Sequence, residues 1–205
     1  MFPLGSVVVP RMVLPLHVFE PRYRRLVQDC LAGDREFGVV LIERGSEVGG
    51  GDVRTDAGTV VRIARADEQP DGRFLVAAVG VRRLRVERWL TDDPYPRADV
   101  VDWPDLAPEG APDGVAVAAA LDDVGALLRR ASALRAELGE PAPPIDQQLS
   151  GDVAVAGYEA TALAPLGPAD KQALLCAPTV GRRLELLREL LADQAVLLEA
   201  RLGAG

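Results

Sequence analysis

The sequence predicts an α+β protein, with a β-rich amino-terminal half followed by an all-helical carboxy-terminal half. Residues 1–103 contain short apolar runs and alternating apolar and polar positions at regular spacing, and only one helical pattern interrupts them. Beyond about residue 115 the apolar residues recur at helical spacing. Short strands at regular spacing favour a small closed or half-closed barrel. We therefore expect a barrel over 1–103, a linker over 104–114 and a helical bundle over 115–205.

The expected strands of the barrel are 7–9, 13–19, 37–42, 58–66, 74–79, 82–89 and 95–101. Pro70-Asp71-Gly72 separates two of them, and its proline and glycine suit a tight turn. Residues 45–52 form a glycine-rich segment that we expect to be a flexible hairpin loop.

A single helix is expected inside the barrel half. Pro21 suits the first position of a helix, where its missing N–H costs nothing, and Gly33 suits the end. An apolar stripe at helical spacing lies between them and consists of Tyr23, Leu26, Val27, Cys30 and Leu31. We expect this stripe to be buried against an open end of the sheet.

Four helices are expected in the second half, near 117–139, 152–164, 168–176 and 179–202. Thr179 suits the cap of the last one. The last helix carries a nearly heptad stripe made of Val180, Leu184, Leu187, Leu191, Ala195, Leu198 and Leu202. This stripe is suited either to closing the bundle or to a weak homodimer.

Charge is divided unequally between the two halves. The 205 residues carry a net charge of −8, of which residues 1–103 contribute −1 and residues 104–205 contribute −7. An acidic half repels a phosphate backbone. The best basic cluster is Arg82, Arg83, Arg85 and Arg88, which Glu87 interrupts. We therefore expect no nucleic-acid partner.

Residues able to carry catalysis are scarce. The sole histidine, His17, lies in an alternating apolar strand, where a satisfied and partly buried side chain is expected. The sole lysine, Lys171, follows Asp170, so no GxxxxGK[ST] phosphate loop exists. Cys30 and Cys176 are far apart and lack metal-ligand spacing. These observations predict no enzyme activity, no cofactor and no metal.

The amino terminus is apolar, but three prolines and Arg11 interrupt it. This pattern suits neither a signal peptide nor a membrane span. The sequence therefore predicts a cytoplasmic protein without a membrane partner.

Seven stretches together resemble the amino-terminal substrate-recognition domain of the Lon protease family. They are LPLHVFEPRYRRLV at 14–27, FGVVLI at 37–42, GTVVRI at 58–63, DGRFLVAAVGVRRLRV at 71–86, PYPRADV at 94–100, APLGPADKQALL at 164–175 and RLELLRELL at 183–191. The first and the sixth are the most specific, and together the stretches span nearly the whole chain.

The resemblance implies a PUA-like β-barrel followed by a helical bundle. It also implies a module that engages unfolded or partner polypeptides, here in a stand-alone form, because the chain lacks the nucleotide loop and the protease dyad of the family. Glu20, Arg22 and Tyr23 in the first stretch are the candidate polypeptide-binding residues. The alternatives are a structural ion pair for Glu20 and Arg22 and, for Tyr23, packing, which is favoured over ligand contact. An RNA-binding PUA-like protein and a stand-alone hydrolase are the alternatives.

Overall fold

The computed structural model describes residues 1–45, 51–107, 114–143 and 148–203. Parts of the predicted loop 45–52, the predicted linker 104–114 and the break at Pro144 lie outside these residues. The chain divides into two compact units, Met1–Pro104 and Asp105–Gly205, which we call the barrel unit and the helical unit. The α+β class is confirmed: of the elements within the described residues, the six strands lie in the barrel unit and four of the five helices lie in the helical unit.

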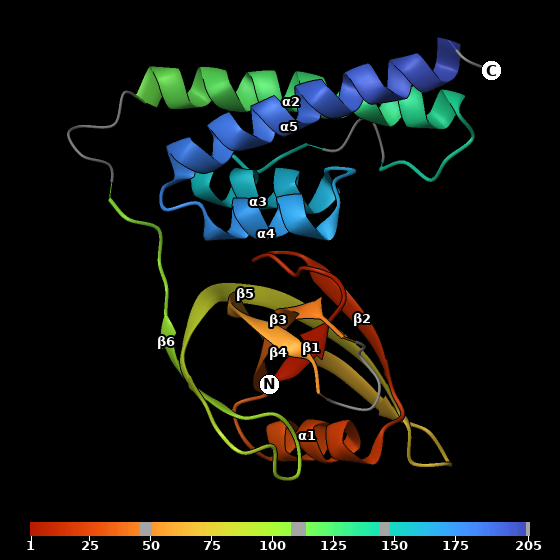
Figure 1. The fold of residues 1–205 in the computed structure, drawn as a ribbon, viewed down its shortest axis with the longest axis vertical. Helices are drawn as coiled ribbons and strands as arrows, with labels where there is room; N and C mark the ends of the chain where they lie inside the picture. The colour runs from red at the N-terminus through yellow and green to blue at the C-terminus, as the bar shows by residue number, and fades with distance from the viewer. Residues whose placement is uncertain (46–50, 108–113, 144–147, 204–205) are drawn as a thin grey trace. The chain divides into compact units, whose positions relative to one another are not determined.

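The barrel unit is built on one curled sheet (Figure 1). Its strands are β1 (Phe2–Leu4), β2 (Val13–Val18), β3 (Glu36–Arg44), β4 (Val53–Glu68), β5 (Phe74–Trp89) and β6 (Ala98–Asp102). The strand order is β1-β3-β4-β5-β2. The long strand β5 pairs with β2 through its residues 74–79 and with β6 through its residues 84–89. β1 and β2 end the order and do not pair with each other among the described residues, so the sheet is a half-barrel.

β5 differs from its prediction because two expected strands, 74–79 and 82–89, form one continuous strand of 16 residues. The chain does not turn at Gly80 and Val81, the two residues left between the expected strands. A Cβ atom at Gly80 would lie 2.3 Å from the carbonyl oxygen of Val9. The glycine therefore permits a close backbone approach within a strand.

The amino-terminal residues also differ from their prediction. Residues 7–9 are buried but form no strand, whereas Phe2–Leu4 pairs in parallel with β3. The carbonyl of Val8 accepts a hydrogen bond from Thr59 Oγ1 at 2.6 Å, and that of Val9 accepts one from the Met12 amide at 3.1 Å. Because a side-chain hydroxyl and a turn amide donate to these two buried carbonyls, the carbonyls have partners without strand pairing. Pro3 is tolerated because β1 ends the sheet order.

Helix α1 (Pro21–Ala32) agrees with its prediction, beginning at Pro21 and ending before Gly33. It lies at one open end of the curled sheet (Figure 1). Tyr23, Leu26 and Val27 are buried in the main core of the unit, with Cys30 and Leu31 partly buried against it. Burying such an apolar stripe supplies most of the stability of a short helix.

The helical unit consists of α2 (Gly114–Glu137), α3 (Val153–Leu163), α4 (Pro168–Cys176) and α5 (Val180–Gly203). Side chains cap two helix starts. The Asp152 carboxylate accepts hydrogen bonds from the amides of Ala154 and Val155, and Thr179 Oγ1 accepts one from the Arg182 amide. Each such cap contributes about 1 kcal/mol.

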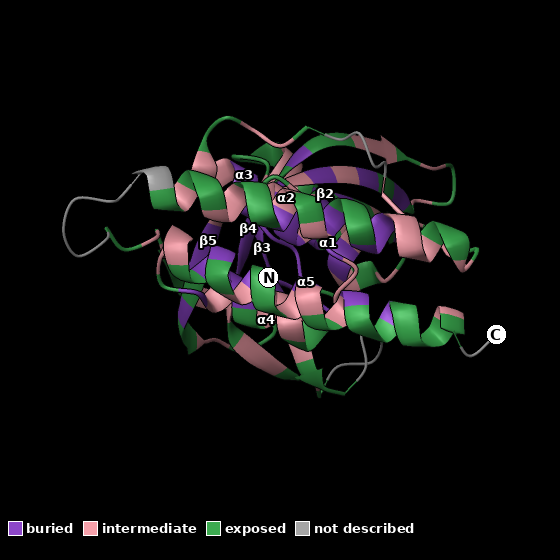
Figure 2. Cartoon of the chain, turned by 90° about the horizontal axis from the view of Figure 1, so that it is seen from above, coloured by how far each residue is buried: buried purple, intermediate pink, exposed green. Residues whose placement is uncertain are grey.

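The predicted stripe of α5 closes the unit. Leu184, Leu187 and Leu191 are fully buried in its core, together with Val124 and Leu128 of α2. The outward sides of α2 and α5 are mostly exposed or intermediate (Figure 2). The stripe is therefore used within the chain, and a homodimer would need another surface.

Among the residues that the structure describes, no helix is both long and apolar enough to cross a lipid bilayer.

Candidate functional site

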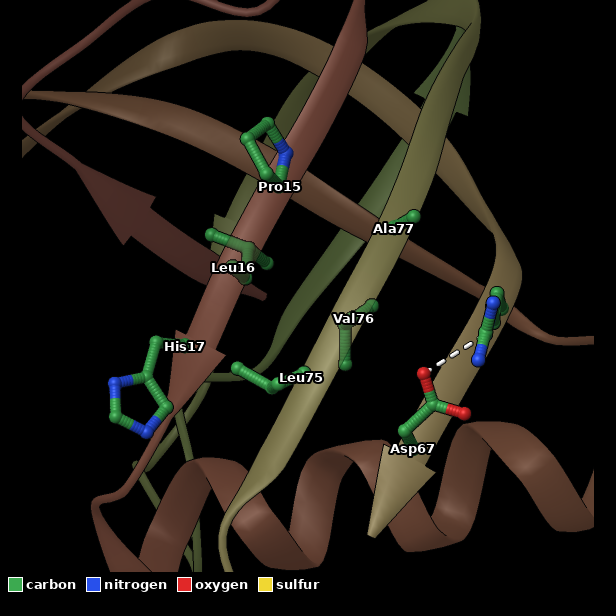
Figure 3. Close-up of a pocket in the computed structure, with 8 residues that line it drawn as sticks. Pro15, Leu16, His17, Asp67, Leu75, Val76 and Ala77 are labelled. Carbon is green, nitrogen blue, oxygen red and sulfur yellow. Dashed lines mark ion pairs between the residues drawn. The ribbon is translucent and has the colours of Figure 1, made fainter. Parts of the chain in front are cut away.

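A hollow of about 520 Å³ lies on the barrel unit where β2, β5 and the end of β4 meet. Figure 3 shows Pro15, Leu16 and His17 on β2 beside Leu75, Val76 and Ala77 on β5. Arg65 and Asp67 complete its lining from β4.

The pleat of the strands decides which side chains face solvent here. Leu14 and Val18 of β2 and Phe74, Val76 and Ala78 of β5 are buried in the core. Successive side chains of a strand point to opposite faces. The alternate residues therefore lie on the outer face, where Pro15 is opposite Ala77 and His17 is opposite Leu75.

Large apolar side chains are exposed on this outer face. Val13, Phe19 and Leu75 are 61%, 52% and 47% exposed. The outer apolar patch, as we call it, consists of Val13, Pro15, Phe19, Leu75 and Ala77. Contiguous exposed apolar residues on a protein surface commonly mark a binding site.

The charged border of the patch is locally neutral. Arg65 Nε lies 2.8 Å from a carboxylate oxygen of Asp67, and both side chains are well exposed. By register Asp67 is opposite Leu75 and Arg65 is opposite Ala77. An exposed pair of this kind adds little stability, but its opposite charges cancel next to the apolar side chains. The site is therefore suited to uncharged apolar groups.

His17 is exposed, so the prediction of a partly buried strand histidine is wrong. The difference follows from the alternation of side chains along β2, which places His17 on the outer face with Val13 and Pro15. Its ring meets that of Phe19 edge-on, with 6.2 Å between centroids.

The structure brings the predicted residues Glu20, Arg22 and Tyr23 together at the start of α1. Arg22 Nε donates to Glu20 Oε2 at 3.0 Å, and the guanidinium lies 4.5 Å from the centroid of the Tyr23 ring. Tyr23 is only 4% exposed and stacks on Phe2 at 4.1 Å. Burial raises the pKa of Tyr23 to about 12. Their role in polypeptide binding stays a prediction, and of the three only Glu20 and Arg22 are partly exposed, with side chains 19% and 22% accessible.

The arginine cluster of β5 is engaged by neighbouring groups. Arg82 pairs with Glu36 at 2.7 Å and Asp102 at 2.8 Å, and Arg88 pairs with Asp99. Arg83 is buried, donates to the Trp103 carbonyl and lies over the Trp103 ring, as Arg85 does at longer range. The cluster therefore presents much less positive charge than the sequence suggests.

The other reactive residues have structural contacts. Lys171 Nζ donates to the Ala162 carbonyl near the end of α3, and burial lowers the pKa of Lys171. Cys30 Sγ donates to the Glu36 carbonyl at 3.2 Å, and burial raises the pKa of this thiol to about 11. The described residues contain no group of three or more His, Cys, Asp or Glu side chains able to hold a metal ion.

Sequence reasoning missed Leu75 and Ala77 as surface residues. Residues 74–79 were predicted as a strand without an assignment of its two faces, and all six residues of the run are apolar. The signal that could have found them is the alternation of side chains along a strand. Leu75 and Ala77 alternate with the core residues Phe74, Val76 and Ala78 and therefore point to the opposite face.

Comparisons with known proteins agree with this architecture. The chain is similar to the Lon N-terminal domain protein from Xanthomonas campestris, with 32% identity, a TM-score of 0.61 and 93% of this chain and 95% of that chain covered. It has the same fold as the N-terminal domain of the Mycobacterium avium complex Lon protease, with 20% identity, a TM-score of 0.64 and coverage of 93% and 97%.

Sequence similarity extends to full-length proteases. Lon protease 1 of Herpetosiphon aurantiacus is 24% identical over 200 residues, which are 96% of this chain and 24% of the relative. Lon protease 2 of Sorangium cellulosum is 27% identical over 205 residues, with the same coverage. The chain thus spans about a quarter of the length of these relatives. The family model for the ATP-dependent protease La (LON) substrate-binding domain matches residues 1–193, so the chain belongs to the Lon substrate-binding domain family.

Proposed function

We propose that this chain is a non-catalytic module that binds exposed segments of unfolded or partner polypeptides through the outer apolar patch. The observation that carries the proposal is the exposure of Val13, Phe19 and Leu75 near a hollow that Leu75 lines, in a domain of the substrate-binding family. Unfolded chains expose the aliphatic and aromatic side chains that folded proteins bury.

The expected affinity is modest. Covering one partly exposed leucine contributes about 1–2 kcal/mol, and a disordered ligand loses conformational entropy when it is ordered. A dissociation constant of about 1 μM needs a net gain of about 8 kcal/mol, so the few contacts of this patch should bind no more tightly than roughly micromolar. Glu20 directly follows Phe19 in the sequence and Arg22 lies two residues further on, and we propose that both border the bound segment.

Polypeptide is favoured over RNA as the ligand. Acidic partners engage Arg82 and Arg88, and the helical half carries a balance of −7. Phosphate binding depends on cations available to replace counterions.

We propose that the chain also lacks hydrolytic activity, for which a casein digest analysed by mass spectrometry is the test. New peptides in that digest would contradict the non-catalytic assignment.

We also propose that the protein works in the cytoplasm. The support is that neither Cys30 nor Cys176 forms a disulfide bond in the structure, as is usual in a reducing compartment.

The test of polypeptide binding is fluorescence anisotropy of a labelled, permanently unfolded polypeptide titrated with the protein, with its folded counterpart as control. We expect saturable binding of the unfolded polypeptide alone. Leu75→Ser should weaken it about tenfold, because about 1.4 kcal/mol of apolar contact is lost.

Val100→Ser is the matched control, since Val100 is 41% exposed but lies on β6, outside the patch. Equal loss in both variants would place the binding elsewhere. Flat titrations for both polypeptides would contradict the function itself.

A further inference from the structure

The outer apolar patch adjoins an edge of the sheet to which no further strand is paired in the described part of the chain. β2 ends the strand order, and β5 is the only strand that pairs with it among the described residues. An edge strand presents a row of backbone N–H and C=O groups to which another chain can bind. Which groups these are follows from the ladder between β2 and β5.

The hydrogen bonds just before β2 decide which residues of β2 are bonded to β5. The Gly80 amide donates to the Met12 carbonyl at 2.9 Å, and the Arg11 amide donates to the Gly80 carbonyl at 2.8 Å. Arg11 has a left-handed φ of 72°, as the first residue of a β-bulge with two residues opposite one. Met12 and Gly80 are therefore a hydrogen-bonded pair.

Hydrogen-bonded and non-bonded pairs alternate along an antiparallel ladder. Leu14, Leu16 and Val18 are thus bonded to β5, whereas the backbone groups of Val13, Pro15 and His17 face the open edge. The presence of a proline at position 15 agrees with this assignment, because a residue without an N–H is tolerated where its backbone does not bond to the neighbouring strand. The edge offers both backbone groups of Val13 and His17 but only the carbonyl of Pro15.

We propose that the open edge of β2 binds a proline-free, uncharged, extended polypeptide segment as an added antiparallel strand. The inference rests on the proposed function and deepens it by naming the binding mode. Side chains of the added strand opposite Val13, Pro15 and His17 lie on the outer face, beside the patch. The neutral Arg65–Asp67 border favours uncharged side chains there.

Pro15 also favours a peptide over a second copy of this chain. A ladder between two β2 strands would contain two prolines, each removing a donor, whereas a proline-free peptide loses only the donor of Pro15. The peptide therefore forms more backbone hydrogen bonds per residue of edge.

The first test uses a short fluorescein-labelled peptide that alternates Val with Thr, in three forms. One is unmodified, and the other two carry N-methyl groups on one or the other alternate set of residues. In an added strand only one set donates to β2, so we expect one methylated form to lose at least about tenfold in affinity relative to the other, since each bond contributes about 0.5–1.5 kcal/mol. Equal affinities of the two methylated forms would overturn the strand mode while leaving the proposed function intact.

The second test changes the protein. His17→Pro removes an N–H from the open edge without removing a bond to β5, and it places a proline after Leu16, whose strand conformation suits that position. His17→Ala controls for the side chain. We expect His17→Pro to bind the unmodified peptide several-fold more weakly than His17→Ala, with similar melting temperatures.

Pro15→Val should act in the opposite direction, because it restores a donor while keeping an apolar side chain. Tighter binding by this variant cannot arise from destabilisation. Equal binding by the His17 variants, or a dimer in light scattering that the peptide does not dissociate, would overturn the proposal. Failure of the unmodified peptide to bind, together with binding of the long unfolded polypeptide, would overturn the strand mode alone.

Discussion

The two units use their exposed apolar side chains differently. The barrel unit exposes Phe19 and Leu75 on the outer face of its sheet, where the hollow also lies. The helical unit buries its leucine stripe between helices and exposes Val196 on the outward side of α5. Both units bury an arginine, Arg83 in the barrel unit and Arg183 in the helical unit. The comparison favours the barrel unit as the one that binds a ligand, because its exposed apolar side chains share a face with a hollow.

Arg183 is the clearest internal contact of the helical unit. Its guanidinium donates to both carboxylate oxygens of Asp105, at 2.5 and 3.0 Å, and to the Leu174 carbonyl at 3.2 Å. The same group lies 4.1 Å from the centroid of the Tyr158 ring. Through these contacts Arg183 ties the first residue of the unit to three of its segments.

The largest expected effect comes from Arg183→Met. It leaves a partly buried carboxylate at Asp105 without its charged partner and should lower the free energy of unfolding of the helical unit by about 3 kcal/mol. Arg130→Met is the control, because Arg130 forms an exposed pair with Glu199 and should cost less than about 1 kcal/mol. Urea unfolding followed by far-ultraviolet circular dichroism measures both. Equal losses of unfolding free energy in the two variants would contradict the claim that the buried ion pair contributes more to stability than the exposed one.

A smaller effect is expected from Gly80→Ala in the barrel unit. The new methyl group must displace the Val9 backbone, so we expect a loss of about 2 kcal/mol. Gly167→Ala serves as the control in the helical unit, since nothing lies within 4 Å of a Cβ atom there. Differential scanning calorimetry should show a lower melting temperature for the barrel unit only. An unchanged melting temperature would mean that β5 is not held against Val9.

The smallest effect is confined to alkaline solution. Burial raises the pKa of Tyr23 in the folded state to about 12, from an ordinary value of 10. A raised folded pKa favours the folded state while the unfolded phenol is protonated, and this advantage is lost as pH rises from about 10 through 12. Tyr23→Phe should unfold less readily than the wild type over this range and equally at neutral pH. Parallel stability curves for the two proteins would contradict a buried Tyr23.

Local patterns in the sequence predicted much of this fold. Pro21, Gly33 and the stripe between them gave helix α1, and Pro168 to Cys176 gave α4 with the observed bounds. These features depend on residues only a few positions apart. The continuity of β5 through Gly80 was not predicted, because the reason for a glycine there is the close approach of Val9, which the strand pattern does not contain.

The candidate site was less predictable than the fold. Glu20, Arg22 and Tyr23 do meet, as expected of neighbours at a helix start, but Tyr23 belongs to the core. The patch joins β2 to β5, whose register is fixed by a bulge at Arg11 and Met12. Similarly, the burial of Arg183 depends on Asp105, which lies 78 residues away. Such long-range pairings are absent from local periodicity.

The central claim is that polypeptide binds the barrel unit at the outer apolar patch. The most direct test compares anisotropy titrations of the labelled unfolded polypeptide for Leu75→Ser and Val196→Ser. Val196 is 64% exposed on α5 and is therefore the equivalent apolar surface residue of the helical unit. We predict about tenfold weaker binding for Leu75→Ser and wild-type binding for Val196→Ser. Wild-type binding by Leu75→Ser with a loss for Val196→Ser would contradict the account and assign the ligand to the helical unit.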